Sequence, residues 1–281
     1  MSETAEVKRM LAARVAARLA QVPGILAVSL GGSLAREQAR IGSDIDLGLY
    51  YRGENRPDLE QLREVATDLR GAAEAVTPLG EWGPWINGGA WLSLDGEQVD
   101  WLYRDLNRVE KVLEHANQGH VARYVQPGHP HGFHEHIYLA EVHYGLVLSD
   151  PGGELIRLQE RLEVYPPKLR ESLISTYLWQ AQFALESCKK PAARGESGYV
   201  AGCLFESVYC LVQVLYALNE RYFINEKGAL AETSMFVLCP LGFEQAAAEI
   251  LGQVGADAEA LERSRRRTAH LLTEVQHLAE V

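Results

Sequence analysis

The stretch from Leu30 to Tyr51 constrains the fold more than any other part of the 281-residue sequence. It starts at the end of an apolar run, passes through Gly31-Gly32-Ser33, and ends in a second apolar run that carries Asp44 and Asp46. Because side chains alternate along a strand, the two carboxylates are expected on one face, roughly 6.6 Å apart along the chain. The apolar residues that alternate with them then point toward a core.

Two carboxylates side by side repel each other unless a cation lies between them, although a solvated turn also explains an isolated Asp-x-Asp pair. The upstream glycines let the backbone approach a ligand, and Ser33 adds a hydroxyl at the expected start of a short helix over residues 34–39. Such a turn favours phosphate. A phosphate cradle followed by paired carboxylates suits Mg²⁺-assisted chemistry on a nucleotide. The sequence therefore predicts Gly32 and Ser33 as phosphate-binding residues.

This order of motifs resembles the signature of the polymerase-β-like nucleotidyltransferase superfamily. Asp100, embedded in the apolar run Gln98–Tyr103, occurs where that superfamily has its third acidic residue. The resemblance implies that Asp44, Asp46 and Asp100 are catalytic and bind Mg²⁺. Asp100 either completes a two-metal site or acts as the base. Family prevalence makes ATP the expected donor, with other nucleoside triphosphates as alternatives.

The periodicity of apolar residues predicts two domains. An α/β (α+β) nucleotidyltransferase domain with a small mixed sheet is expected over residues 1–150, and an all-α helical-bundle domain that selects the acceptor over residues 151–281. The expected strands cover 25–31, 44–51, 75–77, 90–94 and 98–103, with a hairpin turn at Asp95-Gly96. The expected helices cover 4–20, 58–71, 105–118, 168–189, 198–222, 243–253 and 257–279. The first helix has an apolar stripe formed by Val7, Leu11, Val15 and Leu19.

Two loops of unusual composition allow more than one interpretation. Residues 80–91 form a glycine-rich loop with three tryptophans, which is either a lid or acceptor platform or a hydrophobic plug. The segment 120–143 holds six of the nine histidines. Because it offers no cysteine partner and no second tight histidine pair, it does not predict a zinc site. A histidine, Glu135 or Glu141 facing the cleft is the favoured reading, and the role of the segment is left open.

The second half is similar to antibiotic nucleotidyltransferases in its Leu148–Gly153 segment and in Lys227, which follows the second expected bundle helix. The resemblance implies that Lys227 reaches the triphosphate, and a surface lysine in a turn is the alternative. Glu206 and Gln213 share one face of an apolar helix. That face meets either water or the active cleft, where Glu206 would be the general base.

The net charge of −11 argues against DNA or long RNA as the acceptor, because phosphate contacts require a basic surface. It suits a cationic acceptor. No apolar stretch approaches the roughly 20 residues that are needed to cross a membrane. The four cysteines form no Cys-x-x-Cys motif, so a reducing cytoplasm is expected.

These expectations combine into one reaction. A Mg²⁺-dependent enzyme would transfer a nucleoside monophosphate from ATP to a hydroxyl of a small cationic acceptor, such as an aminoglycoside antibiotic, and release pyrophosphate. It would thereby confer antibiotic resistance. The alternatives are nucleotidylylation of a protein or tRNA, as in toxin–antitoxin pairs, and a catalytically idle nucleotide-binding protein. Whether the cleft is built within one chain or across a homodimer is left open.

Overall fold

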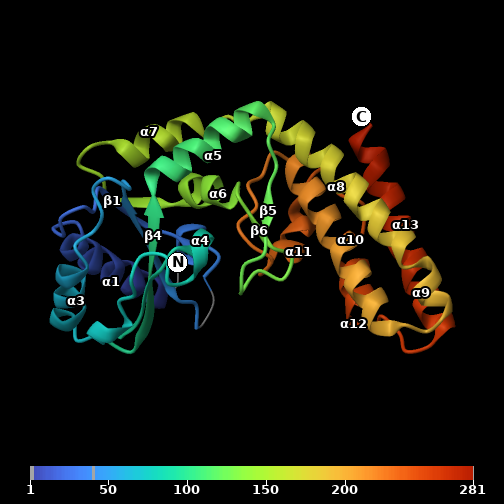
Figure 1. The fold of residues 1–281 in the computed structure, drawn as a ribbon, viewed down its shortest axis with the longest axis horizontal. Coiled ribbons are helices and arrows are strands. Elements are labelled where there is room, and N and C mark those ends of the chain that lie inside the picture. The colour runs from blue at the N-terminus through green and yellow to red at the C-terminus, as the bar shows by residue number, and fades with distance from the viewer. Residues whose placement is uncertain (1–2, 40–41, 281) are drawn as a thin grey trace. The chain divides into compact units, whose positions relative to one another are not determined.

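The computed structural model describes residues 3–39 and 42–280, and the chain divides into two compact units (Figure 1). Unit 1 comprises Met1–Glu114 and Tyr138–Val164, and unit 2 comprises His115–Ile137 and Tyr165–Val281. Each unit is thus made of two stretches of chain. This division differs from the single boundary at residue 150 expected from the sequence.

Unit 1 is built on a five-stranded mixed sheet with the strand order β3-β4-β2-β1-β7. Its strands are β1 (Ala27–Leu30), β2 (Ile45–Tyr51), β3 (Gly89–Leu94), β4 (Glu97–Asp105) and β7 (Leu146–Ser149). β2 and β4 are parallel, whereas β1–β2, β1–β7 and β3–β4 are antiparallel. The predicted small mixed sheet is confirmed. The β3–β4 hairpin turns at Asp95 and Gly96, as expected.

The helices of unit 1 are α1 (Glu3–Leu19), α2 (Gly32–Ala35), α3 (Leu59–Asp68), α4 (Gly83–Ile86), α6 (Ile137–Tyr144) and α7 (Glu154–Arg161), with a short 3₁₀ helix η1 (Ala73–Ala75). α5 (Leu106–Gln118) starts in unit 1 and ends in unit 2, and Ile137 of α6 falls in unit 2. The strand expected over residues 75–77 is wrong. Thr77 bonds to the carbonyl of Gly89 through its N–H (2.8 Å) and its hydroxyl (3.1 Å), without forming a ladder.

One face of the sheet forms the core of unit 1 together with α1 and α3. Its buried side chains include Leu11, Val15, Leu19, Ile45, Leu47, Leu62, Val65, Val99, Trp101 and Tyr103. They alternate along the strands with residues of the opposite face, as a half-buried sheet requires. This alternation is why Asp46 and Asp100 lie on the face away from that core.

The buried stripe of α1 differs by one position from the sequence prediction. Val7 is 55% exposed, and the adjacent Lys8 is only 5% exposed. The Nζ of Lys8 donates to the carbonyl of Ser43 (2.5 Å) and lies 2.7 Å from Oε2 of Glu97. These partners compensate the buried ammonium group, which hydrophobic periodicity cannot foresee.

The bonds made by α7 explain why it belongs to unit 1 rather than to the helical unit. Arg52 at the end of β2 pairs with Glu154 of α7 (2.5 Å). The Asp150 carboxylate accepts hydrogen bonds from three N–H groups at the start of α7 (2.9–3.0 Å). The amide of Gln159 donates to two carbonyl groups at the end of α6. Asp150 therefore acts as a helix cap.

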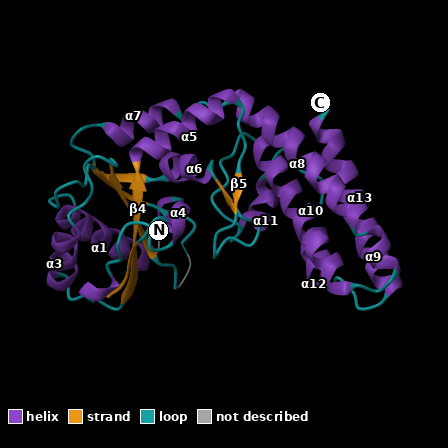
Figure 2. Cartoon of the chain, in the orientation of Figure 1, coloured by secondary structure: helices purple, strands orange, loops and turns teal. Residues whose placement is uncertain are grey.

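Unit 2 is mostly helical (Figure 2). Its helices are α8 (Pro167–Ser187), α9 (Lys189–Ala193), α10 (Ser197–Leu218), α11 (Ala229–Glu232), α12 (Phe243–Gly252) and α13 (Ala258–Ala279), with the 3₁₀ helix η2 (Thr233–Met235). α8, α10 and α13 pack against one another. The predicted helical region over residues 151–281 is confirmed as mostly helical. Unit 2 also contains a short antiparallel pair from the earlier stretch 115–137, β5 (Arg123–Tyr124) and β6 (Phe133–His134).

α10 corrects the expectation that no segment approaches a membrane span. The helix has 22 residues, and an 18-residue window of it has a mean hydropathy of 1.6, so its length and composition alone would allow it to cross a membrane. However, 67% of its apolar window is buried inside the protein. Burial of this kind is what the core helix of a soluble fold shows.

Candidate active site

The glycine turn packs directly against the second aspartate of the Asp-x-Asp pair. The N–H of Gly31 donates to the carbonyl oxygen of Asp46 (2.8 Å). Gly32 has a φ of +61°, and a Cβ built there would lie 1.9 Å from Oδ2 of Asp46. Only glycine leaves room for this carboxylate, and the predicted approach of the glycine backbone to a phosphate stays a prediction. Ser33 follows in α2, which is a single turn rather than the helix expected over 34–39.

Asp46 and Asp100 are direct partners on the parallel strands β2 and β4. Neighbouring strands lie roughly 4.8 Å apart, so the two half-buried side chains start close together on one face of the sheet. The residues beside them, among them Leu47 and Trp101, are fully buried on the opposite face. The structure thus brings together two of the three carboxylates predicted to bind metal.

Asp44, the third predicted carboxylate, lies one residue before β2 and is exposed. Its neighbour Ser43 is anchored to α1 by the buried ammonium group of Lys8. Lys8 therefore positions the approach to β2, and the sequence analysis missed it because a lysine at the edge of an apolar stripe is normally exposed.

The tryptophan loop contributes an exposed ring to the same face. Trp91 on β3 is the direct partner of Asp100 and is 64% exposed. Its ring stacks on Trp82, with centroids 4.4 Å apart and planes 18° apart. Trp85 lies under the Arg108 guanidinium, 5.4 Å from the ring centroid, and its carbonyl accepts from Tyr138. The loop thus has one exposed ring in a stacked pair and one packed ring, and its use as an acceptor platform stays a prediction.

A buried ion pair lies farther along this face of the sheet. Arg104, two positions after Leu102 on β4 and 3% exposed, contacts Glu141 of α6 through Nε (2.5 Å) and Nη2 (2.7 Å). Its Nη1 donates to the carbonyl groups of Ile86 and Tyr103 (2.9 and 3.0 Å). Glu141, which the sequence offered as a cleft residue, is therefore engaged by an arginine.

Glu206 lies in unit 2 on α10, where its carboxylate contacts other side chains of that unit. Oε1 lies 2.7 Å from Nη1 of Arg123, and Oε2 lies 3.5 Å from Nε2 of His131. Gln213 on the same helix face is 1% exposed and contacts His136 (3.3 Å). This face of α10 contacts segment 115–137: Gln213 is buried, whereas the side chain of Glu206 stays 31% exposed. The role of Glu206 as general base stays a prediction.

Glu206 also borders a cavity of about 390 Å³ within unit 2. The residues that line this cavity are Arg123, Tyr124, Val125, His129, Pro130, His131, Gly132 and Glu206. Lys227 lies in the segment between α10 and α11 and is exposed. Its N–H donates to the side-chain oxygen of Asn225 (2.9 Å), and its phosphate contact stays a prediction.

Three of the six histidines in the histidine-rich segment, His131, His134 and His136, are buried in unit 2. Burial lowers the pKa of His131 to about 4 and that of His134 well below its usual range, so both imidazoles are neutral at pH 7. His134 Nδ1 lies 2.6 Å from the hydroxyl of Tyr177. Its Nε2 lies 3.1 Å from Nδ1 of His131. These histidines form a buried polar chain, which explains much of the segment's composition.

Side chains of metal-ligand type gather at two places in the described parts of the chain, 3–39 and 42–280. One group is His115, His120 and Glu135, and the other is His131, Glu206 and Cys210. In each group the ligand atoms lie within 4.8 Å of one another. Both groups are in unit 2, and the predicted carboxylate set is not among them. The assignment of Mg²⁺ to that set stays a prediction.

Comparisons with known proteins match the two parts of the chain to different families. Residues 134–227 match a domain family of unknown function, DUF4037. No curated protein matches the chain. A crystal structure of a nucleotidyltransferase-like protein from Exiguobacterium sibiricum 255-15 aligns with a TM-score of 0.43 and 10% identity. That alignment covers 99% of this chain and 74% of the other.

Residues 13–121 match the family described as the nucleotidyltransferase domain. The matched range contains the glycine turn, all three aspartates and the Trp91 platform. It supports an enzyme of the nucleotidyltransferase type, which is the reaction class predicted from the sequence. The chain therefore carries an N-terminal nucleotidyltransferase domain, followed by a mostly helical C-terminal region.

Proposed function

We propose that the protein is a Mg²⁺-dependent nucleotidyltransferase that moves AMP from ATP to a hydroxyl group of a small cationic acceptor, such as an aminoglycoside antibiotic. Pyrophosphate is the second product. The observation that carries the proposal is the direct pairing of Asp46 with Asp100 beside the Gly31-Gly32 turn. The net charge of −11 favours a cationic acceptor over a polyanion.

The residues at the carboxylate pair fit a magnesium ion. Mg²⁺ prefers carboxylate and phosphate oxygens, and Asp46 and Asp100 supply carboxylates from adjacent rigid strands. The Asp46 carboxylate occupies the space that a Cβ at Gly32 would fill, so the glycine turn lies directly beside this proposed ligand. Bound magnesium would neutralise triphosphate charge and make the attacking hydroxyl more acidic. Asp46, Asp100 and the exposed Asp44 would hold it.

The protein groups around the pair have separate tasks in this proposal. The backbone of Gly32 and the hydroxyl of Ser33 bind the β- and γ-phosphates, because a glycine turn lets a phosphate come close to main-chain N–H groups. The stacked rings of Trp82 and Trp91 offer a flat surface beside Asp100. A nucleobase or a protonated amino group of the acceptor would be attracted to such a surface.

The experiment incubates the full chain with Mg²⁺, each labelled nucleoside triphosphate and a panel of aminoglycosides, and follows labelled product and pyrophosphate. Asp46→Asn and Asp100→Asn keep side-chain size and remove the charge. Asp68→Asn is the matched control, because Asp68 is an exposed aspartate at the end of α3 paired with Arg18.

We expect AMP transfer from ATP in the wild-type and Asp68→Asn proteins and a loss of at least about 100-fold in the other two. Full transfer by Asp46→Asn and Asp100→Asn would show that the assignment of the carboxylates is wrong. Magnesium-dependent ATP binding without transfer to any compound in the panel would instead contradict the proposed acceptor class.

A further inference from the structure

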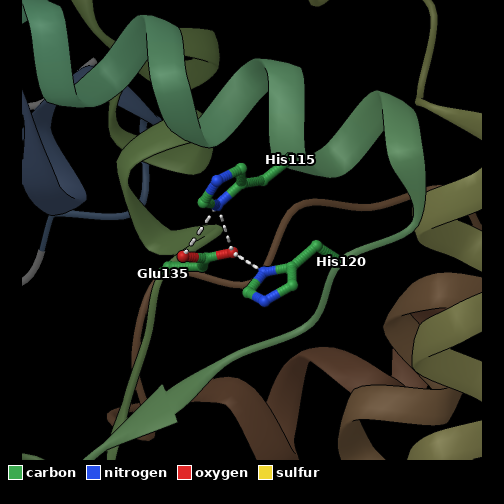
Figure 3. Close-up of side chains that lie close together, drawn as sticks. All are labelled: His115, His120 and Glu135. Atoms are coloured by element: carbon green, nitrogen blue, oxygen red, sulfur yellow. Dashed lines mark hydrogen bonds and ion pairs between the residues drawn. The ribbon is translucent and has the colours of Figure 1, made fainter.

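We infer that unit 2 carries a zinc-binding site formed by His115, His120 and Glu135 (Figure 3). His115 lies in the last turn of α5, and His120 follows two residues after that helix. Glu135 comes directly after β6, at the entry to α6. The three residues thus come from two stretches of chain that meet in unit 2.

The chain conformation around the end of α5 brings the two histidines to the same side. The N–H of His120 donates to the carbonyl of His115 (2.9 Å), which turns the chain back on the helix end. The N–H of Glu135 donates to the carbonyl of Ala122 (3.1 Å) and fixes the second stretch against the first. Backbone bonds therefore fix the chain segments from which the three side chains extend, and the side chains contact one another.

The ligand atoms have the spacing of a metal coordination shell. Nδ1 of His120 lies 2.8 Å from Oε1 of Glu135, and Nδ1 of His115 lies 3.3 and 3.5 Å from the two carboxylate oxygens. Figure 3 shows both imidazoles presenting a nitrogen to the same carboxylate. Around a tetrahedral zinc ion with bonds near 2.0–2.1 Å, ligand atoms are about 3.3–3.5 Å apart. Small side-chain adjustments would therefore admit the ion.

The charge of Glu135 also calls for a cation. The residue is 5% exposed, and a buried carboxylate is costly unless a positive group compensates it. Within residues 3–39 and 42–280, its side-chain partners are the two imidazoles and include no lysine or arginine. A divalent ion bound between the carboxylate and the two imidazoles would supply that charge.

The types of ligand favour zinc, and the exposure of His120 shows that the ion could enter from solvent. Two imidazole nitrogens and one carboxylate suit zinc, which accepts nitrogen and oxygen ligands without a strong geometric preference. His120 is 51% exposed in its side chain, so one side of the group faces solvent. Three protein ligands leave a fourth position for water, as in zinc sites that bind a further ligand.

The second histidine-containing group of unit 2 provides a contrast. Nη1 of Arg123 lies 2.7 Å from Oε1 of Glu206 and 2.9 Å from Nε2 of His131. A guanidinium group thus already contacts both of these ligand atoms and supplies the positive charge. Cys210 Sγ lies 3.6 Å from the same imidazole nitrogen, but the arginine disfavours a second cation there. The site with no arginine is the better zinc site.

The test uses the full chain, stripped of metal with a chelator and then titrated with Zn²⁺ against a chromogenic chelator. Zinc retained after gel filtration is measured per chain. His120→Gln and Glu135→Gln each remove one ligand. His270→Gln is the control, because His270 is an exposed histidine (74%) that pairs with Glu274 (3.7 Å) without a second histidine. Circular dichroism checks that every variant folds.

We expect one zinc ion per wild-type chain, a rise in Tm on adding zinc, and no change in either property for His270→Gln. Each ligand variant should lose more than about 100-fold in affinity, since even residues that only contact a ligand cost about 10–100-fold. His120→Gln decides the question if Glu135→Gln does not fold. A wild-type chain that retains no zinc, or equal affinity in His120→Gln, would overturn the inference.

Discussion

Replacing Gly32 with alanine is the sharpest test of the close packing between the glycine turn and the carboxylate pair. The new Cβ would lie 1.9 Å from Oδ2 and 2.9 Å from Cγ of Asp46. To reach an ordinary contact distance of 3.4 Å, the carboxylate oxygen must retreat by about 1.5 Å. Gly32→Ala therefore moves a proposed metal ligand without changing its chemistry.

Gly32→Ala is expected to have a small effect on stability and a large effect on activity. An L side chain at a φ of +61° costs about 1–2 kcal/mol, and the reduced entropy of the unfolded chain offsets about 0.4–1 kcal/mol of it. A net loss near 1 kcal/mol lowers Tm by about 2–4 °C in a domain of this size. A displacement of about 1 Å at a reacting group reduces turnover by about 100-fold. Activity should therefore fall far more than stability.

Gly96→Ala is the matched control, because Gly96 has a φ of +84° and nothing lies within 4 Å of the position that a Cβ would take there. Thermal unfolding and AMP transfer are measured for both variants. We expect similar losses in Tm, with transfer reduced about 100-fold only in Gly32→Ala. If Gly32→Ala transfers AMP within about threefold of the wild-type rate, the carboxylate of Asp46 does not need this position and the reasoning fails.

Two further predictions concern buried charge. Arg104→Met should lower the free energy of unfolding by about 3–5 kcal/mol in urea titrations, because the negative charge of Glu141 loses its partner. The double variant with Glu141→Gln should recover part of that loss. A loss below about 1 kcal/mol would contradict the buried ion pair. Burial lowers the pKa of His136 from 6.5 to about 4. The unfolded chain therefore binds a proton that the folded chain does not, and stability falls as pH falls from 7 toward 4. His136→Gln should remove about 2 kcal/mol of the decrease between pH 7 and 5, and equal pH slopes would refute this.

The sequence predicted strands and helices well where the spacing of apolar residues and the residues of the adjoining turns pointed to the same element. The alternation through Asp46 and Asp100 gave two strands with one buried face each, and Asp95-Gly96 gave the hairpin between β3 and β4. The long helices of unit 2 begin and end within a few residues of the ranges predicted from the spacing of apolar residues. These features depend on neighbours close in sequence, which is why a single sequence reveals them.

Contacts between distant segments explain what the sequence did not predict. Lys8 is buried because Ser43 and Glu97 compensate its charge. These partners lie far away in sequence, so the spacing of apolar residues around Lys8 could not predict them. The two units each combine separate stretches of chain, so one boundary could not describe them. The group of His115, His120 and Glu135 has the same origin, since His120 and Glu135 are fifteen residues apart and meet through the β5–β6 pairing.

The contacts of Glu206 bear on which carboxylate accepts the proton from the acceptor hydroxyl. Its Oε1 is held 2.7 Å from the Arg123 guanidinium, and its Oε2 faces His131. To act as general base, this carboxylate would first have to leave an ion pair, and the remaining arginine would then lie half-buried without its partner. Asp100 is the direct strand partner of Asp46 and lies beside an exposed tryptophan ring. We therefore propose that Glu206 holds Arg123 in the wall of its own cavity rather than acting as the base. Asp100 is then the remaining candidate for the base role, as the alternative to its role as a metal ligand.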